Sequence, residues 1–448
     1  MAKKYDLVIV GGGPAGLMAA RVAGENGLKT ALLERRKTIT STRRVDGGGL
    51  SPINEYICGE KLTFNPKVKR IGFPVNGFSV RYDGPYRDMY GFRIFSPSGK
   101  MISFGDYEQL KKDPEKNRVG IALNKGALLQ GLFKDAQAAG VEIFPDTNVT
   151  AVETGENSVK VTGNGKPFEG SFVIAADGIN SRLARLMSMN KDRKFIATMV
   201  DRVWNMEGID LPQIVGISFV VTDYGNFFVS RVCREGNYHV GVSTYHPGDD
   251  LEGKLNKFVY KDPVYSHWFK GAKKTEEHAC VVNLLSPIQE PFKDNVLFVG
   301  DSAWLMEISN PFAIICGWKA ANAVTLAVLD GKLNKEGIAS YLQWWEDKFY
   351  VPHGQVEFKP LHLHDYLDAE AIDYLAGLVK EPLISTMNFY KLFSTIGSTY
   401  AELFPVIQEE RPDVMKKLMD IANEMDEIET KARKAGFPNR YFNPRVKE

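Results

Sequence analysis

Residues 5–35 read YDLVIVGGGPAGLMAARVAGENGLKTALLER, and this stretch decides the fold. An apolar run at residues 7–10 leads into glycines spaced as Gly-x-Gly-x-x-Gly, and a second apolar run at residues 30–33 ends at Glu34. The glycines of the motif are Gly11, Gly13 and Gly16. In a strand–turn–helix unit they permit the tight turn, admit a pyrophosphate and let the helix pack closely, while the helix amides face the phosphate charge. The stretch therefore predicts a βαβ unit that binds a dinucleotide, with Glu34 accepting hydrogen bonds from a ribose.

This stretch alone leaves the nucleotide open. FAD and NAD both present an adenosine ribose to Glu34, and Arg35 and Arg36 beside it could accept a 2′-phosphate. A glycine-rich turn that binds nothing is the structural alternative.

Two later segments each carry an aspartate from a buried-type strand to a turn. They are residues 172–178, FVIAADG, and residues 296–303, VLFVGDSA. A carboxylate at such a turn accepts hydrogen bonds from backbone amides or from a ligand hydroxyl. Taken singly, such an aspartate more often caps a turn or a helix than binds a ligand. In this order, after the N-terminal motif, the segments resemble the two-domain FAD-dependent reductases and hydroxylases built like p-hydroxybenzoate hydroxylase. The resemblance implies FAD, with Asp177 and Gly178 near its pyrophosphate and Asp301 at its ribityl chain.

Within that superfamily, the chain to about residue 345 is most similar to the geranylgeranyl reductase family. Residues 44–51, RVDGGGLS, resemble the family's Cys-Gly-Gly-Gly-Leu-Ser segment against the flavin, and residues 224–229, YGNFFV, resemble its Tyr-x-Trp-x-Phe-Pro stretch along the lipid cavity. Lys125 stands where relatives carry an arginine near the cofactor. The resemblance places FAD at Gly11, Gly13, Ala15, Gly16, Glu34, Arg35, Asp46, Gly47, Gly48, Gly49, Lys125, Asp177, Gly178, Asp301, Pro311, Cys316 and Gly317.

Several letters depart from the family pattern. Asp46 replaces the family's Cys, Asn226 replaces its Trp and Val229 replaces its Pro. We therefore expect a substrate that differs from a family lipid. An inactive homologue that still binds the cofactor is the alternative.

The segment after Pro311 departs as well. Family members carry a flexible glycine loop there, which lets backbone amides approach the flavin, whereas residues 312–317 read FAIICG before a helix predicted from Gly317. Ile314 and Cys316 would push the ring away or present side chains to it. At the N-terminus of a helix beside flavin, the Cys316 thiol would have a lowered pKa, which makes it a candidate catalytic residue.

Asp46 and Tyr224 are the other catalytic candidates. A carboxyl group desolvated beside an apolar substrate has a raised pKa and could deliver a proton, so Asp46 is the first candidate donor. Bonding the amides of the turn at residues 47–49 is an equally good role for it. Tyr224, His239 and Tyr245 lie on a predicted sheet, where alternation alone does not say which face each occupies.

Composition is that of a folded enzyme. The 448 residues are 44% hydrophobic and 25% charged, close to the globular average. The net charge of +1 gives no electrostatic case for nucleic acid. The four cysteines are too scattered for a metal pattern, so no metal is expected, and a strand begins too early for a signal peptide. We expect a cytoplasmic protein, and a peripheral membrane contact through the aromatic residues at 344–350 is the alternative to their packing in the core.

These patterns predict an α/β protein: a Rossmann-like FAD-binding domain, an antiparallel β-sheet substrate domain and a helical C-terminal region. The boundaries are 1–190 and 291–334 for the first, 191–290 for the second and 335–448 for the third. A β-meander is predicted at residues 149–174, the substrate sheet at residues 214–285, and helix boundaries at prolines 352, 360, 382, 405 and 412.

The predicted activity is reduction, or the reverse desaturation, of carbon–carbon double bonds in an apolar and isoprenoid-like small molecule, by hydride transfer through flavin. A single Gly-x-Gly-x-x-Gly leaves no second dinucleotide domain, so electrons come from transiently bound NAD(P)H or from a carrier protein. The alternatives are an aromatic monooxygenase, which uses the same two-domain frame, and a non-catalytic flavin-binding protein. The oligomeric state is not readable from the sequence.

Overall fold

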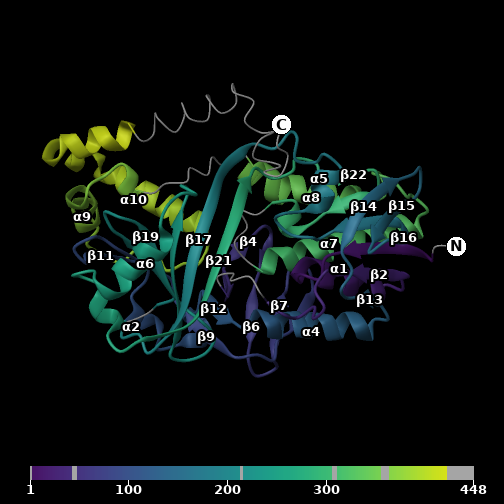
Figure 1. Ribbon diagram of the computed structural model, residues 1–448, viewed down its shortest axis with the longest axis horizontal. Coiled ribbons are helices and arrows are strands. Elements are labelled where there is room, and N and C mark those ends of the chain that lie inside the picture. The colour runs from purple at the N-terminus through teal and green to yellow at the C-terminus, as the bar shows by residue number, and fades with distance from the viewer. Residues whose placement is uncertain (1–2, 43–47, 212–214, 305–309, 355–362, 421–448) are drawn as a thin grey trace.

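A mostly parallel sheet forms the half of the molecule in which the sequence predicts FAD binding, called here the FAD-binding half; the computed structural model describes residues 3–42, 48–211, 215–304, 310–354 and 363–420 (Figure 1). Strand β1 lies between β2 and β16, with β13 beyond β2 and β23 also pairing with β16. These strands are β1 (Lys4–Val10), β2 (Thr30–Leu33), β13 (Glu142–Phe144), β16 (Lys166–Ala175) and β23 (Val296–Phe298). Strands β2 and β23 are fully buried and mostly apolar, as expected for a parallel sheet covered on both faces.

Helices and a meander cover this sheet. Helix α1 (Pro14–Glu25) packs against both α4 (Lys125–Ala138) and α7 (Asn310–Leu329). The predicted β-meander is confirmed, because β14 (Val149–Thr154) and β15 (Val159–Gly163) continue antiparallel onto β16. Helix α5 (Arg182–Leu186) contacts β14.

Helix α7 begins earlier than the sequence suggested. The prediction of a loop at residues 312–317 and a helix from Gly317 is wrong, since α7 starts at Asn310. Its first two turns are apolar and buried, with Pro311 in the first turn, where its missing N–H costs no helical hydrogen bond. Among the described residues, α7 is the one helix long and apolar enough to cross a membrane, and most of it is buried inside the protein.

A seven-stranded sheet forms the second half. Its order is β11-β10-β18-β19-β20-β17-β21, antiparallel except for β10 beside β18. The strands are β10 (Phe92–Phe95), β11 (Met101–Ser103), β17 (Phe195–Glu207), β18 (Ile217–Val221), β19 (Asn226–Arg231), β20 (Asn237–Thr244) and β21 (Lys273–Leu285). The predicted sheet is confirmed, while β17 and the two strands from residues 92–103 were not predicted as its members.

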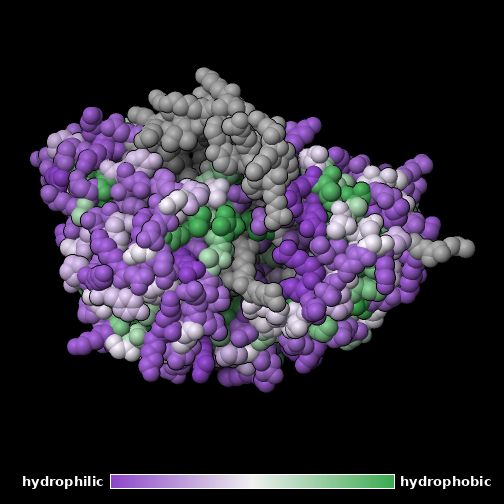
Figure 2. Space-filling model, in the orientation of Figure 1, coloured by the Kyte–Doolittle hydropathy of each residue, from purple (hydrophilic) through white to green (hydrophobic). Residues whose placement is uncertain are grey.

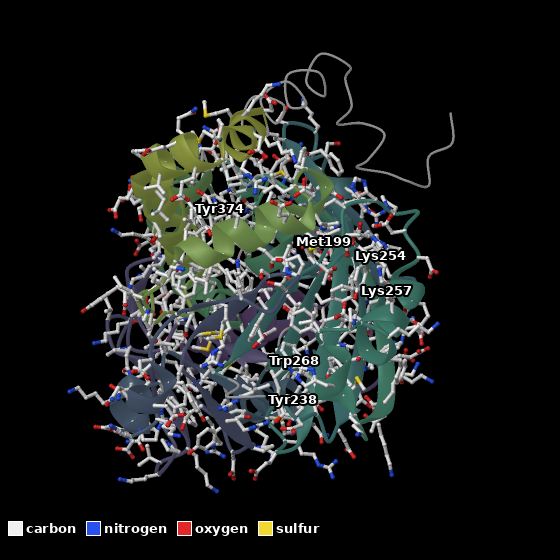
Figure 3. All side chains as sticks on the ribbon, turned by 90° about the vertical axis from the view of Figure 1, so that its left-hand side faces the viewer. Met199, Tyr238, Lys254, Lys257, Trp268 and Tyr374 are labelled. Atoms are coloured by element: carbon white, nitrogen blue, oxygen red, sulfur yellow. The ribbon has the colours of Figure 1, made fainter. Side chains whose placement is uncertain are left out.

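The two faces of this sheet have different neighbours. Helix α6 (Leu251–Tyr260) packs on one face over Trp204, Phe227 and Val240. On the opposite face, α9 (Ala369–Leu378) and α10 (Phe389–Glu410) cover the β10–β18 side. Figure 3 shows this division, with Lys254 and Lys257 of α6 on one side of the view and Tyr374 of α9 on the other.

The rest of that opposite face turns toward the FAD-binding half. Met199 and Val282 sit on it and pack with Ile179, two residues after Asp177. We call the side chains of β19, β20, β17 and β21 on this face the inner wall. Figure 2 shows hydrophobic residues gathered between the two halves, over the region where β17 and β21 run.

Smaller elements join the two halves. Strand β12 (Gly120–Leu123) pairs with β3 (Gly49–Leu50) and with β9 (Tyr86–Met89). The remaining strands are β4 (Tyr56–Ile57), β5 (Glu60–Lys61), β6 (Thr63–Asn65), β7 (Arg70–Phe73), β8 (Phe78–Arg81) and β22 (Phe292–Lys293). The remaining helices are α2 (Tyr107–Leu110), α3 (Pro114–Asn117), α8 (Ala339–Trp345), a π-helix over Glu346–Gly354 and short 3₁₀ turns at Ser266–Phe269, Gly300–Ser302 and Leu363–Asp365.

The C-terminal region is helical as predicted, but its prolines do not all mark boundaries. Pro382 lies between α9 and α10, whereas Pro405 lies inside α10. A proline removes one helical hydrogen bond, and burial of the apolar face of α10 at Ile407 against α9 compensates for that loss. The prediction of a boundary at Pro405 is therefore wrong.

Candidate functional site

The glycine turn after β1 has the geometry that a pyrophosphate needs. Gly11 has φ +111°, and a Cβ added there would lie 2.2 Å from the Ala176 carbonyl oxygen. A Cβ on Gly16 would lie 1.8 Å from the Gly11 carbonyl oxygen. At Gly13, by contrast, no described atom lies within 4 Å of the Cβ position. The first and third glycines are thus required by packing, and the second faces open space at the start of α1.

The N-terminus of α1 suits an anion. Pro14 occupies its first turn, and that turn carries no acidic side chain. The amides of Ala15 and Gly16 fall in the turn whose N–H groups lack acceptors within the helix. Together with the helix dipole, these amides favour a bound phosphate.

Glu34 connects the end of β2 to the glycine turn. It is 5% exposed, and its Oε2 accepts a hydrogen bond of 2.6 Å from the Gly12 amide. Its Oε1 accepts from the Arg36 amide and guanidinium at 2.8 and 2.9 Å. Burial alone would raise the pKa of Glu34, but the hydrogen bonds and charge of Arg36 and the Gly12 amide hold it below its usual value. The ribose role of Glu34 stays a prediction, and Arg36 is the partner that the sequence did not identify.

The two aspartate segments lie against the glycine turn. Ala176 touches Gly11, and a Cβ on Gly300 would lie 3.3 Å from the Ala15 Cβ. Segments far apart in the sequence therefore meet at one point, where FAD would be held: the glycine turn, the Asp177–Gly178 turn and Asp301. Gly178 has φ +81°, which favours glycine at that turn.

Asp177 caps a helix and keeps one oxygen for a ligand. Its Oδ2 accepts hydrogen bonds from the Arg182 and Leu183 amides at 2.7 and 3.1 Å. Its Oδ1 is buried and has no hydrogen-bond partner in the described structure. Burial raises the pKa of this carboxyl group, against the hydrogen bonds that favour its charge. An unpartnered buried oxygen beside the glycine turn fits the polar groups of a dinucleotide.

The Gly-Gly-Gly segment meets α7 and β12. The Asn310 amide group donates to the Gly49 carbonyl at 3.2 Å, and the Leu123 amide donates to the Gly48 carbonyl at 2.6 Å. Lys125 is the first residue of α4, just after β12. Asp46 and Gly47 lie outside the described residues, so their predicted roles stay predictions.

Cys316 does not occupy the predicted position. It lies in the second turn of α7, not at the N-terminus, and is 2% exposed in the core of the FAD-binding half. Gly317 serves packing, since a Cβ there would lie 2.1 Å from the Ala15 carbonyl oxygen and prevent α7 from crossing α1 closely. Arg35 is exposed at the surface.

Tyr224 lies on the other side of the sheet from the FAD-binding half. It packs against the cluster under α6, its hydroxyl donates to Asp262 at 2.7 Å, and the Lys257 ammonium lies 3.5 Å from its ring centroid. Burial, helped by the charge of Asp262, raises the pKa of Tyr224. Tyr224 lies in the turn before β19, so it does not share the sheet face of Asn226. The expectation that it reaches the substrate is therefore wrong. His239 and Tyr245 do lie on the inner wall.

The buried aromatic residues of α8 and of the π-helix that follows it are structural. Trp345 and Phe349 are buried and stacked on each other, and the Trp345 indole donates to the Ile288 carbonyl at 2.9 Å. For Trp345 and Phe349 this confirms the packing alternative, while Trp344 and Tyr350 are partly buried against the same core. No group of three or more potential metal ligands occurs in the described parts of the chain.

Comparison with known proteins agrees with this site. The family model described as FAD dependent oxidoreductase matches residues 6–41. The digeranylgeranylglycerophospholipid reductase of Methanocella arvoryzae is 30% identical over 360 residues, 76% of this chain and 82% of that protein. Its counterpart in Thermoplasma acidophilum is 26% identical over 93% of this chain and 99% of that protein.

Solved structures share the fold. A geranylgeranyl bacteriochlorophyll reductase-like protein from Thermoplasma acidophilum superimposes with a TM-score of 0.68 at 21% identity, over 94% of this chain and all of that one. A p-nitrophenol 4-monooxygenase from Pseudomonas putida gives 0.59 at 14% identity, over 95% of this chain and 99% of that one. The fold is therefore that of the FAD-dependent oxidoreductases with a Rossmann-type domain. By its sequence similarity over most of its length, the chain belongs to the geranylgeranyl reductase family of FAD-dependent oxidoreductases.

Proposed function

We propose that this protein reduces, or in the reverse direction desaturates, carbon–carbon double bonds of an apolar substrate with an isoprenoid chain. The relatives named digeranylgeranylglycerophospholipid reductases support this substrate class. The observation that carries the proposal is the meeting of the glycine turn, Asp177 and Gly300 opposite the inner wall.

Bound FAD would supply hydride transfer to or from the substrate. The chain's own part is to hold the substrate and exclude water. Met199, Val282 and Leu284 present apolar side chains beside Ile179, next to the Asp177–Gly178 turn, and suit an isoprenoid chain there. Asp46 remains the proposed proton donor.

Tyr245 adds a neutral polar group to the same wall. Burial raises the pKa of its hydroxyl to about 12, and the charge of Asp201 adds to the effect. The hydroxyl therefore keeps its proton near neutral pH and can orient a substrate without contributing charge.

We propose that NAD(P)H or a carrier protein supplies the electrons. We also propose that the protein is cytoplasmic. A peripheral membrane contact, if the substrate is a bilayer lipid, fits α10, which exposes Phe393, Phe404 and Val406, better than the buried aromatic residues of α8.

The test is turnover with purified holoenzyme. The flavin is reduced anaerobically with dithionite and mixed with geranylgeraniol, and its visible spectrum and the product mass are followed. Reoxidation with a gain of two hydrogens per reduced double bond supports the proposal. NAD(P)H oxidation that requires oxygen and an aromatic effector, with a hydroxylated product, would instead identify a monooxygenase. A flavin that no donor reduces would indicate a binding protein.

A further inference from the structure

Four polar atoms on the inner wall are buried without hydrogen-bond partners in the described structure. They are Asp201 Oδ1, Asn205 Oδ1, Asn226 Oδ1 and Ser230 Oγ. Ser230 is 2% exposed as a whole residue. Because buried polar groups in native proteins are normally paired, a group of four on one surface indicates a ligand that completes them.

Strand register places these residues in two rows that are four residues apart along the strands. Asn226 pairs with Ser243 on β20, Ser243 with Asp201 on β17, and Asp201 with Cys280 on β21. Side chains paired in this way share a face and have Cβ atoms about 5 Å apart. Asn226 and Asp201 thus belong to one polar row.

The second row runs parallel to the first. Ser230 pairs with His239, and His239 pairs with Asn205. Between the rows, the Phe228 ring lies over Gly241, where an added Cβ would be 2.2 Å from the ring. The wall therefore alternates a polar row, an aromatic surface and a polar row.

The wall adjoins the site already described. Met199 lies two residues before Asp201, on the same face of β17, and it packs with Ile179 beside the Asp177–Gly178 turn. The row of Asn226 and Asp201 is therefore the one nearer to the proposed FAD site.

The unpaired atoms are mostly acceptors. Asp201 offers one carboxylate oxygen, since the other accepts from the Cys280 thiol at 3.1 Å. The Asn205 Nδ2 donates to Glu276 at 3.0 Å, which orients the amide and leaves its Oδ1 as an acceptor without a partner among the described residues. Acceptors require donors, and the Asp201 carboxylate disfavours an anion.

On these observations, and resting on the proposed function, we propose that the substrate carries a hydrogen-bond donor group, hydroxyl or amino, which binds the polar row of Asp201 and Asn226 on either side of Ser243. Asn226, in place of the family's Trp, supplies part of this polarity. The group recognised here is therefore not the negatively charged phosphate of a phospholipid.

The experiment measures binding to the oxidised holoenzyme by titrating the visible flavin spectrum. The probes are geranylgeraniol, its methyl ether, its phosphate ester and geranylgeranylamine. We expect the alcohol or the amine to bind at least tenfold more tightly than the ether, and the phosphate ester to bind no better than the ether. Whichever of alcohol and amine binds more tightly identifies the donor.

Two serines provide matched control variants. Ser230 and Ser218 are both buried and lie on adjacent strands, and neither hydroxyl has a partner among the described residues. Ser218, however, pairs with Val229 and faces α6. Asp201→Asn should reduce the alcohol-to-ether affinity ratio at least threefold, whereas Ser218→Ala and Ser230→Ala, which lie on the other face and in the other row, should leave it unchanged. Asn226→Trp should bring the ratio close to one.

Equal affinities for alcohol, amine and ether, tighter binding of the phosphate ester, or an equal effect of Ser218→Ala would overturn the inference. If the donor preference holds but no double bond is reduced, the proposed function fails and the inference stands. If the ether binds as tightly as the alcohol and its double bonds are reduced, the proposed function stands and the inference fails. Absence of binding by every probe contradicts both.

Discussion

The Gly12 amide donates a 2.6 Å hydrogen bond to Oε2 of Glu34, so the carboxylate at the end of β2 fixes the glycine turn after β1. Arg36 holds the same carboxylate from the other side and also donates to the Gly12 carbonyl at 2.9 Å. The turn and the proposed ribose ligand are therefore one hydrogen-bonded unit. A change at Glu34 should affect both stability and cofactor retention.

We predict that Glu34→Ala retains less FAD and is less stable by about 1–3 kcal/mol, because it leaves the Gly12 amide and Arg36 without their buried acceptor. Flavin per protein after gel filtration and the free energy of unfolding in urea are the measurements. Glu34→Gln, which keeps one acceptor oxygen, is the control. Its flavin content and its free energy of unfolding should lie between those of wild type and Glu34→Ala. If the Glu34→Ala protein kept a full complement of FAD, Glu34 would not be the ribose ligand.

The same carboxylate predicts a pH dependence. Its pKa in the folded protein is lowered below the ordinary value of 4.5, so its contribution to stability is complete above that value and is lost as pH falls through the folded pKa. The difference in unfolding free energy between wild type and Glu34→Gln should therefore be constant near neutrality and shrink below about pH 4.5. A difference that grows on acidification would contradict the charged state assigned to Glu34.

The glycines of the turn predict opposite phenotypes. Gly13 faces open space, so Gly13→Ala should fold with nearly wild-type stability but lose flavin, because its methyl group occupies the space of the pyrophosphate. Gly16→Ala places a methyl group 1.8 Å from the Gly11 carbonyl and should prevent folding. Circular dichroism and flavin content separate the two results. Normal flavin content in Gly13→Ala would place the phosphates elsewhere.

Tyr224 is predicted to stabilise the sheet without taking part in turnover. Tyr224→Phe removes the hydrogen bond to the buried Asp262 and should lower the free energy of unfolding by about 1–3 kcal/mol. Since the residue faces α6, kcat and KM should stay within twofold of wild type. A tenfold fall in kcat with normal flavin content would return Tyr224 to the site.

The parts of the fold that the sequence predicted are those with a strong local pattern. β2 was predicted at its observed residues, and the meander and most of the substrate sheet follow from alternation. β17 was missed because one of its faces carries Asp201 and Asn205, whose polar side chains obscure the apolar pattern of the other face. The start of α7 was missed because the expected glycine loop rested on family resemblance, while residues 312–316 form a buried helical turn.

Site residues were harder to predict than elements. The period of a strand shows which residues share a face but not which face meets the cofactor, and this explains the error at Tyr224. Arg36 was considered only as a ligand for a 2′-phosphate, whereas it binds Glu34 two residues away. The polar rows of the inner wall depend on strand pairing between distant segments, which leaves no local signal in the sequence. Asn226 was detectable only as a departure from the family's Trp, and its meaning became clear from the neighbours that strand pairing gives it.

Cys316 supplies the last prediction. Because the thiol is 2% exposed inside α7 and packed in the core, it should not react with 5,5′-dithiobis(2-nitrobenzoate) in the native protein, but should react once urea unfolds the chain. Cys58, Cys233 and Cys280, which are partly exposed, serve as internal references, and Cys316→Ser identifies the slow thiol. Replacing this buried sulfur by a hydroxyl should cost about 1–3 kcal/mol of stability, because a polar group enters an apolar site. A fast-reacting native Cys316 with a lowered pKa would show instead that it lies at an open surface beside the flavin.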